Sequence, residues 1–176
     1  MKKILIILIL IVTTIYLYSN QKDNKIITIP NDSIRIRVIP STNATYDQYM
    51  KFKVKTYIEE NLSTLLKDEK DISKAEKIIT DNISNFENDI EKIFIENDYQ
   101  ESVTLSFGNN FFPKKEYKGV VYNEGYYQSL VISIGQSQGD NWWCVLFPPL
   151  CLLEAEESTT QEYKFAVIEI INKIFA

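Results

Sequence analysis

The spacing of apolar residues along the chain switches between a period of two and a period of three to four. Residues 33–39 alternate between Ile or Val and mostly polar side chains, which predicts a half-buried β-strand that ends at Pro40. Residues 45–67 and 72–97 carry apolar side chains at steps of three and four, which predicts two amphipathic helices. Residues 161–175 have the same spacing and predict a closing helix.

Between the second and the closing helix, apolar and polar residues alternate again. Residues 101–107 predict a strand that ends in a turn at residues 108–110. Residues 119–122 and 126–134 predict a hairpin around residues 123–125, where Gly tolerates a positive φ. Strand runs separated by helical blocks indicate the α+β class, with a small, mainly antiparallel sheet packed against two or three helices.

The first 25 residues have the pattern of an export signal. Lys2 and Lys3 precede the apolar run 4–18, which has the length of a secretory h-region and is shorter than the ~20 residues of a typical spanning helix. No small-residue cleavage site follows, so residues 1–25 are a signal peptide or an uncleaved membrane anchor, with a buried core helix as the alternative. Export places residues 26–176, a single α+β domain, outside the cytoplasm, either secreted or membrane-anchored.

Composition narrows the chemistry. The 176-residue chain has no His, which excludes Ser-His-Asp and Cys-His catalysis and His-based metal sites, and we expect no cofactor and no metal. The net charge of −5 argues against nucleic acid as a partner. Residues 71–98 alone have a net charge of −5, equal to that of the whole chain. They form either an acidic docking face or a solvated helix surface. The composition therefore leaves two classes of protein: a binding or signalling module, or an enzyme whose catalytic groups are carboxylates.

Residues 135–151 are the most distinctive segment. The part from Asn141 to Cys151 contains two Trp, one Phe and two Pro, and it carries no charge. Because Pro148 and Pro149 prevent a regular helix or central strand, we expect an apolar loop that either folds into the core or forms an interaction surface. Gly135 and Gly139 do not match a phosphate-binding loop and predict tight turns leading into the Trp pair.

The two cysteines, Cys144 and Cys151, flank this apolar segment. In an oxidising compartment an isolated cysteine pair is a disulfide candidate. The alternative is a pair of buried, reduced thiols that act as small hydrophobic side chains.

The segment from Asn141 to Cys151 resembles the signature of the stage II sporulation protein R family of endospore-forming bacteria. The opening strand at residues 29–39 is similar to the family's start, and Asp47-Gln48 with Lys51 and Lys53 is similar to its basic helix entry. The resemblance continues in Tyr126-Tyr127 and in residues 132–135, where the family has a strand running into its Gly loop. Ser137 stands where the family usually has the middle Gly of that loop.

The resemblance implies a developmental signal that acts by binding and not by catalysis. Family members are made in the forespore, exported into the space between the two membranes, and signal to a membrane-bound aspartic protease of the mother cell. That protease then cleaves a sigma-factor precursor. On this interpretation the partner is the protease, and residues 4–18 contact the membrane if they are not cleaved.

The apolar segment is where we expect the partner to bind. The expected contact residues are Asn141, Trp142, Trp143, Phe147, Pro148, Pro149 and Leu150. One alternative is a carboxylate-based cell-envelope hydrolase, although no spacing selects a pair among Asp47, Glu116, Glu124 and Asp140. Another is a structural envelope protein that touches the bilayer through its Trp, Phe and Pro side chains.

Overall fold

The structure is a computed structural model that describes residue 4 and the ranges 11–13, 27–152 and 160–175. The predicted export segment therefore lies almost wholly outside the described residues. Within those ranges, none of the helices combines the length and the apolar character that crossing a bilayer requires.

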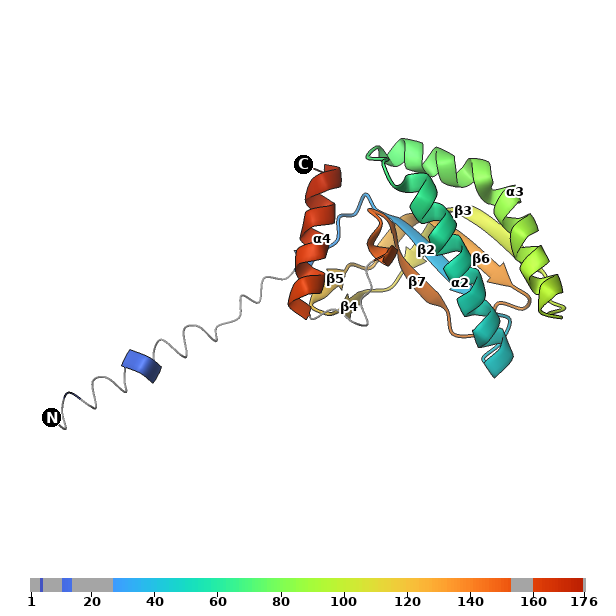
Figure 1. Ribbon diagram of the computed structural model, residues 1–176, viewed down its shortest axis with the longest axis horizontal. Coiled ribbons are helices and arrows are strands. Elements are labelled where there is room, and N and C mark those ends of the chain that lie inside the picture. Colours follow the sequence, from blue (N-terminus) through green and yellow to red (C-terminus); the bar gives the residue numbers. More distant parts are fainter. Residues whose placement is uncertain (1–3, 5–10, 14–26, 153–159, 176) are drawn as a thin grey trace.

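A four-stranded sheet forms the centre of the molecule (Figure 1). Its strand order is β3 (Val103–Phe112), β6 (Gly125–Ile134), β2 (Ile34–Ile39) and β7 (Trp142–Phe147). The β3–β6 and β2–β7 pairs are antiparallel, whereas β2 and β6 run parallel. Strand alternation separates the two faces of this sheet: on β2, Ile34, Ile36 and Val38 enter the larger core.

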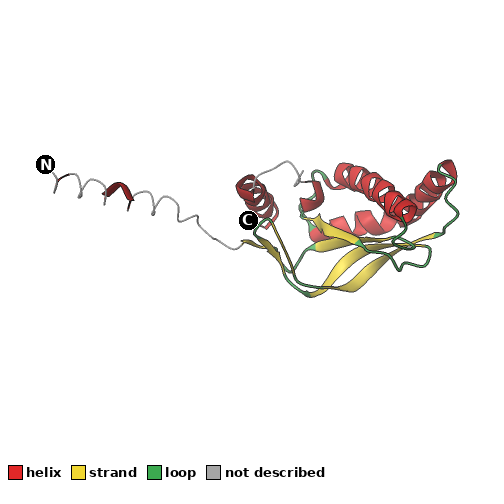
Figure 2. Ribbon diagram, turned by 90° about the horizontal axis from the view of Figure 1, so that it is seen from below, coloured by secondary structure: helices red, strands yellow, loops and turns green. Residues whose placement is uncertain are grey.

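Two long helices cover one face of this sheet (Figure 2). They are α2 (Thr45–Leu66) and α3 (Ile72–Glu96), and both predicted helices are confirmed with nearly the predicted ends. Asp71 caps α3 because its Oδ1 accepts hydrogen bonds from the amides of Ser73 and Lys74 at 2.9 and 3.3 Å. Each helix buries an apolar stripe against the sheet, comprising Met50, Val54, Ile58, Leu62 and Leu66 in α2 and Ala75, Ile79, Phe86, Ile90 and Phe94 in α3.

A second, smaller core lies beside the first. It joins a three-stranded sheet of order β1 (Ile27–Thr28), β5 (Val120–Tyr122) and β4 (Lys115–Tyr117) to the closing helix α4 (Thr160–Phe175). The closing helix is confirmed. Figure 1 shows α4 beside the small sheet and away from α2 and α3. The buried side chains of this core are Ile27, Ile29, Val120, Tyr122, Val145, Leu150, Tyr163 and Val167.

The α+β class is confirmed, and three of the five strand pairings in the described residues are antiparallel. Two local predictions are wrong. The turn at residues 108–110 is absent because β3 continues through it, paired residue by residue with β6 as far as Phe112 opposite Gly125. The hairpin is absent because β5 and β6 belong to different sheets, so residues 123–124 carry the chain from one sheet to the other.

Candidate functional site: strand β7 and the groove between the two helices

The predicted apolar loop is a strand in this structure. Residues 142–147 form β7 at the edge of the main sheet, and a short 3-10 helix, η1 (Leu150–Leu152), follows the Pro148-Pro149 pair. The prolines do not interrupt the strand because they come directly after its last residue, where no ladder hydrogen bond is required. The expectation of an irregular loop is therefore wrong.

Burial divides the expected contact residues into two groups. Asn141 is exposed, and Trp142, Trp143 and Pro149 are half-buried. Phe147, Pro148 and Leu150 are buried, with exposed fractions of 0% for Phe147 and 2% for Leu150. In the free protein the side chains of the second group lie inside the molecule, and their contact with a partner stays a prediction. Phe147 packs in the larger core and Leu150 in the smaller one, at the end of β7.

Trp142 faces the larger core and the helix α2. The Lys55 ammonium lies 5.1 Å from the centre of its indole ring, within the range of a cation–π interaction. Lys55 also forms a 2.7 Å ion pair with Glu59 one turn later on α2. Burial raises the pKa of the Glu59 carboxyl, although Lys55 opposes this shift. The Oε1 atom of Glu59 has no hydrogen-bond partner among the described residues.

Trp143 points to the opposite face and packs against the smaller core. Its ring makes edge contacts with Phe112 and Tyr122, with ring centres 5.6 and 5.9 Å away. The ammonium group of Lys115 lies 5.2 Å from the indole centre. Since Trp142 and Trp143 are neighbours in one strand, β7 takes part in both cores at once.

Arg35 lies beneath Trp143 in a cage of aromatic rings. Its side chain is fully buried, and its guanidinium carbon lies 3.7 Å from the Tyr127 ring centre, 5.4 Å from that of Phe112 and 5.5 Å from that of Trp143. Nη2 donates a 3.4 Å hydrogen bond to the carbonyl oxygen of Asn123, whereas Nε and Nη1 have no hydrogen-bond partner among the described residues. Burial lowers the pKa of this guanidinium. The aromatic faces therefore replace the carboxylate that usually accompanies a buried arginine.

Gly135 and Gly139 both lie where a side chain would collide with its surroundings. Gly135 ends β6 in a turn at φ +53°, and an added Cβ would lie 2.3 Å from Oε2 of Glu101. At Gly139 the Cβ would lie 2.2 Å from the carbonyl oxygen of Thr42. The amide of Gly139 donates to the carbonyl of Pro40 at 3.2 Å. These contacts close the loop after β6 onto the turn between β2 and α2.

Of the carboxylates considered for hydrolysis, Asp47 is hydrogen-bonded within the fold, and Glu116, Glu124 and Asp140 are exposed. Asp47 accepts hydrogen bonds from the hydroxyls of Tyr99 at 2.9 Å and Thr42 at 2.5 Å, which use both of its oxygens in the fold. Glu116 is exposed on β4 in the small sheet. Within the described ranges, no group of three Cys, Asp or Glu side chains is arranged to hold a metal ion.

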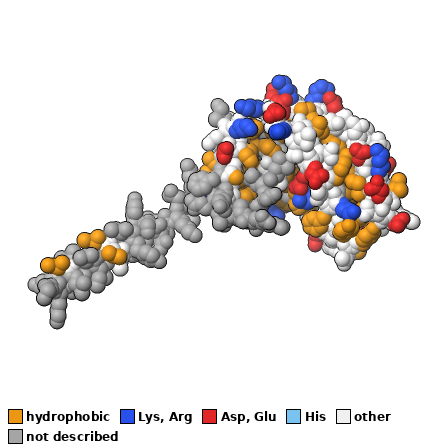
Figure 3. Space-filling model, viewed as in Figure 1, with side chains coloured by type: hydrophobic (Ala, Val, Ile, Leu, Met, Phe, Trp, Pro, Cys, Tyr) orange, Lys and Arg blue, Asp and Glu red, His pale blue; other side chains and the backbone are white. Residues whose placement is uncertain are grey.

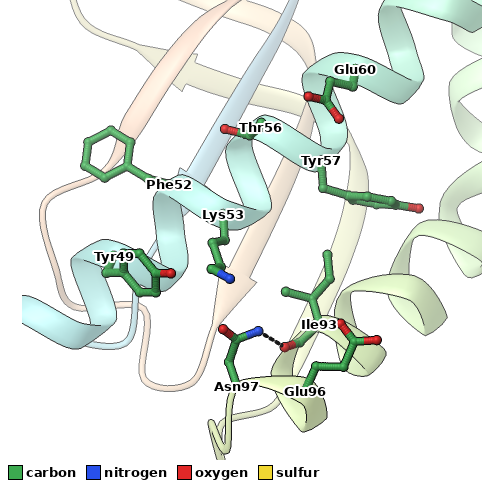
Figure 4. Close-up of a pocket in the computed structure, with 9 residues that line it drawn as sticks. All are labelled: Tyr49, Phe52, Lys53, Thr56, Tyr57, Glu60, Ile93, Glu96 and Asn97. Atoms are coloured by element: carbon green, nitrogen blue, oxygen red, sulfur yellow. Dashed lines mark hydrogen bonds between the residues drawn. The ribbon is translucent and has the colours of Figure 1, made fainter.

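A groove between α2 and α3 is a feature that the sequence analysis missed. It has a volume of about 430 Å³ and is drawn in Figure 4, where Lys53 and Asn97 point toward one another across it. Tyr49 and Phe52 on its α2 side are 49% and 52% exposed. The groove is lined by Tyr49, Phe52, Lys53, Thr56, Tyr57, Glu60, Ile93, Glu96 and Asn97.

The exposed aromatic side chains of α2 form a strip along this groove. Tyr46 and Tyr49 stack with ring centres 6.0 Å apart, and the Lys53 ammonium lies 5.3 Å from the Tyr49 ring centre. Figure 3 shows hydrophobic side chains at the surface over this part of α2. The signal in the sequence is the three-residue spacing of Tyr46, Tyr49 and Phe52, which continues outside the buried stripe of the helix.

Fold and site together define an α+β protein in which one tryptophan-bearing strand takes part in two cores, beside a helix pair with an aromatic groove. A family model described as stage II sporulation protein R matches residues 30–157. The chain belongs to this family, which gives it a role in sporulation.

A relative from Bacillus subtilis (strain 168), named Stage II sporulation protein R, is 29% identical over 136 residues. The matched region is 77% of this chain and 61% of the relative, so the chain spans about three-fifths of that relative's length. No solved structure matches the chain.

Proposed function

We propose that this protein is an exported sporulation signal that activates a membrane-bound aspartic protease of the adjacent mother cell. The protein acts outside the cytoplasm, and its binding triggers cleavage of a sigma-factor precursor. Membership of the stage II sporulation protein R family supports the sporulation context. Residues 4–18 attach the protein to the membrane if they are retained.

The aromatic groove is the observation that carries the proposal of action by binding. Side chains such as Tyr49 and Phe52 are half exposed in the free protein, and aromatic residues of this kind supply most of the energy at protein interfaces. Lys53, Glu60 and Glu96 surround them with charges that orient a partner. Asn141, Trp142, Trp143 and Pro149 stay candidates for a second contact.

The two alternatives receive less support from the described residues. A hydrolase needs two carboxyl groups that converge on a substrate, and Asp47 is occupied by the hydroxyls of Tyr99 and Thr42. Insertion of the apolar segment into a bilayer needs its side chains at the surface, and Phe147 and Leu150 are in the cores.

Co-expression with the protease and the sigma-factor precursor tests the proposal, with precursor cleavage as the readout. The native chain should produce cleavage, and a chain-free control should not. The double variant Tyr49→Ala/Phe52→Ala should lower the cleavage rate at limiting chain by a factor of about 10 or more, because each lost anchor costs over ~1 kcal/mol. The midpoint of its denaturant unfolding should be nearly that of the native protein, since both side chains are half exposed.

The matched control is Tyr126→Ala, an exposed aromatic on β6 that does not line the groove. We expect it to leave cleavage unchanged. Full cleavage with the double variant would show that the groove is not the contact. An absence of cleavage with the native chain would contradict protease activation itself.

A further inference from the structure

Cys144 lies in β7, and Cys151 lies in η1, the short helix that follows this strand. Both thiols approach the carbonyl oxygen of Val145, with Sγ of Cys151 at 2.8 Å and Sγ of Cys144 at 3.7 Å. Both residues are half-buried and pack against the larger core. Both cysteines are free in this structure, and because their sulfurs approach the same carbonyl oxygen, the two side chains are neighbours between β7 and η1.

We propose that Cys144 and Cys151 are oxidised to a disulfide in the exported protein. The bridge closes an eight-residue loop that contains Phe147, Pro148 and Pro149. This inference rests on the export that is part of the proposed function, because structural disulfides persist in oxidising compartments.

The oxidant is a protein or small-molecule disulfide, and the reaction is thiol–disulfide exchange. The Cys144 thiolate attacks one sulfur of the oxidant's disulfide, forming a mixed disulfide and releasing the oxidant's first thiol. Cys151 then loses its proton and attacks the Cys144 sulfur, which releases the oxidant's second thiol. Two cysteine thiols and one disulfide thus become one cysteine disulfide and two thiols. Burial raises the pKa of Cys151, which makes it the slower nucleophile and suits it to the second, intramolecular attack.

The bridge acts on the tryptophan-bearing strand. Val145, whose carbonyl oxygen both thiols approach, is buried in the smaller core, whereas the cysteines pack on the larger one. A covalent link here ties the end of β7 to η1 and restricts the motion of Trp142 and Trp143 relative to both cores. The oxidised protein therefore presents this strand in one arrangement.

A redox titration tests the inference. Purified full-length protein is equilibrated with mixtures of reduced and oxidised glutathione, quenched in acid, alkylated with a maleimide and weighed intact. We expect both thiols to disappear together, with a mass loss of about 2 Da and no glutathione adduct. The oxidised form should unfold about 5 °C higher than the reduced form, because the bridge restricts the unfolded chain. Alkylation of both thiols in excess oxidised glutathione, or a stable adduct on one, would overturn the proposal.

Three controls complete the test. Cys144→Ser and Cys151→Ser should each retain one thiol that is alkylated or glutathionylated, and Cys144→Ala/Cys151→Ala should not shift in unfolding temperature between redox buffers. Protein taken from sporulating cells by acid quenching should resist alkylation until it is reduced, and full alkylation there would overturn the proposal. The titration needs no protease, so a bridged protein that fails to activate cleavage contradicts only the proposed function.

Discussion

The guanidinium carbon of Arg35 lies 3.7 Å from the centre of the Tyr127 ring, on the face of the sheet opposite α2 and α3. Burial lowers the pKa of Arg35, and the nearby side chains that oppose this shift are those of Tyr127, Tyr122 and Cys144. A planar, weakly hydrated guanidinium tolerates this environment better than an ammonium group does. The arrangement explains why a charged residue occupies the interior position of a central strand.

Three replacements of Arg35 should separate the contribution of its volume to stability from the contribution of its charge. Arg35→Ala should lower the free energy of unfolding by ~3 kcal/mol or more, because it leaves a large cavity among the rings. Arg35→Met should cost less than half as much, since it keeps the packing and removes the desolvated charge. Arg35→Lys should be less stable than Arg35→Met. Urea unfolding measures all three, and equal losses for Met and Ala would show that the cation–π contacts carry the stability.

Gly139 and Gly108 form a matched pair for testing the loop after β6. Gly139→Ala should lower the free energy of unfolding by ~1–3 kcal/mol, because its Cβ must displace the backbone carbonyl of Thr42. At Gly108 an added Cβ meets no atom within 4 Å among the described residues, so Gly108→Ala should change stability by less than ~0.5 kcal/mol. Thermal unfolding of the two variants measures this difference. Equal stability would show that the loop shifts without cost.

Glu59 should give a pH-dependent difference from its amide variant. Burial raises its pKa above the ordinary 4.5, so the folded protein favours the neutral carboxyl. The stabilisation from Glu59 is therefore complete below pH 4.5 and is lost as the pH rises through the raised pKa. Glu59→Gln should be more stable than the native chain at pH 7, with the difference disappearing toward pH 4.

Glu91→Gln, a change at an exposed carboxylate of α3, is the control for the amide itself. Denaturant unfolding at several pH values measures both variants. If Glu59→Gln were instead the less stable protein at pH 7, the ion pair with Lys55 would outweigh the cost of burial.

Features that depend on local periodicity were predictable. The alternation of residues 33–39 correctly separates Ile34, Ile36 and Val38 from Arg35 and Arg37, and the two long helices follow from their apolar stripes. The turn predicted at residues 108–110 was wrong because Gly and Asn favour turns locally, whereas β3 pairs with β6 at ten consecutive residues. These pairings override the local preference. Partners distant in sequence decide such cases.

The candidate site shows the same division. The tryptophan pair stands out by composition, but its burial depends on β7 lying at the edge of one sheet and against a second core. The aromatic rings around Arg35 belong to residues 77 to 108 positions further along the chain. No local spacing in the sequence could therefore predict this cage. The groove depends on how α2 and α3 pack, although the spacing of Tyr46, Tyr49 and Phe52 was a signal for its aromatic side.

The placement of the two indoles gives the protein a pair of built-in spectroscopic reporters. They are its only tryptophans, and they face different cores from adjacent positions in one strand. Replacing Trp143 by Phe leaves fluorescence that follows the packing of α2 and α3, and replacing Trp142 by Phe leaves fluorescence that follows the small sheet and α4. The order in which the two halves of the molecule assemble can therefore be timed without an added dye.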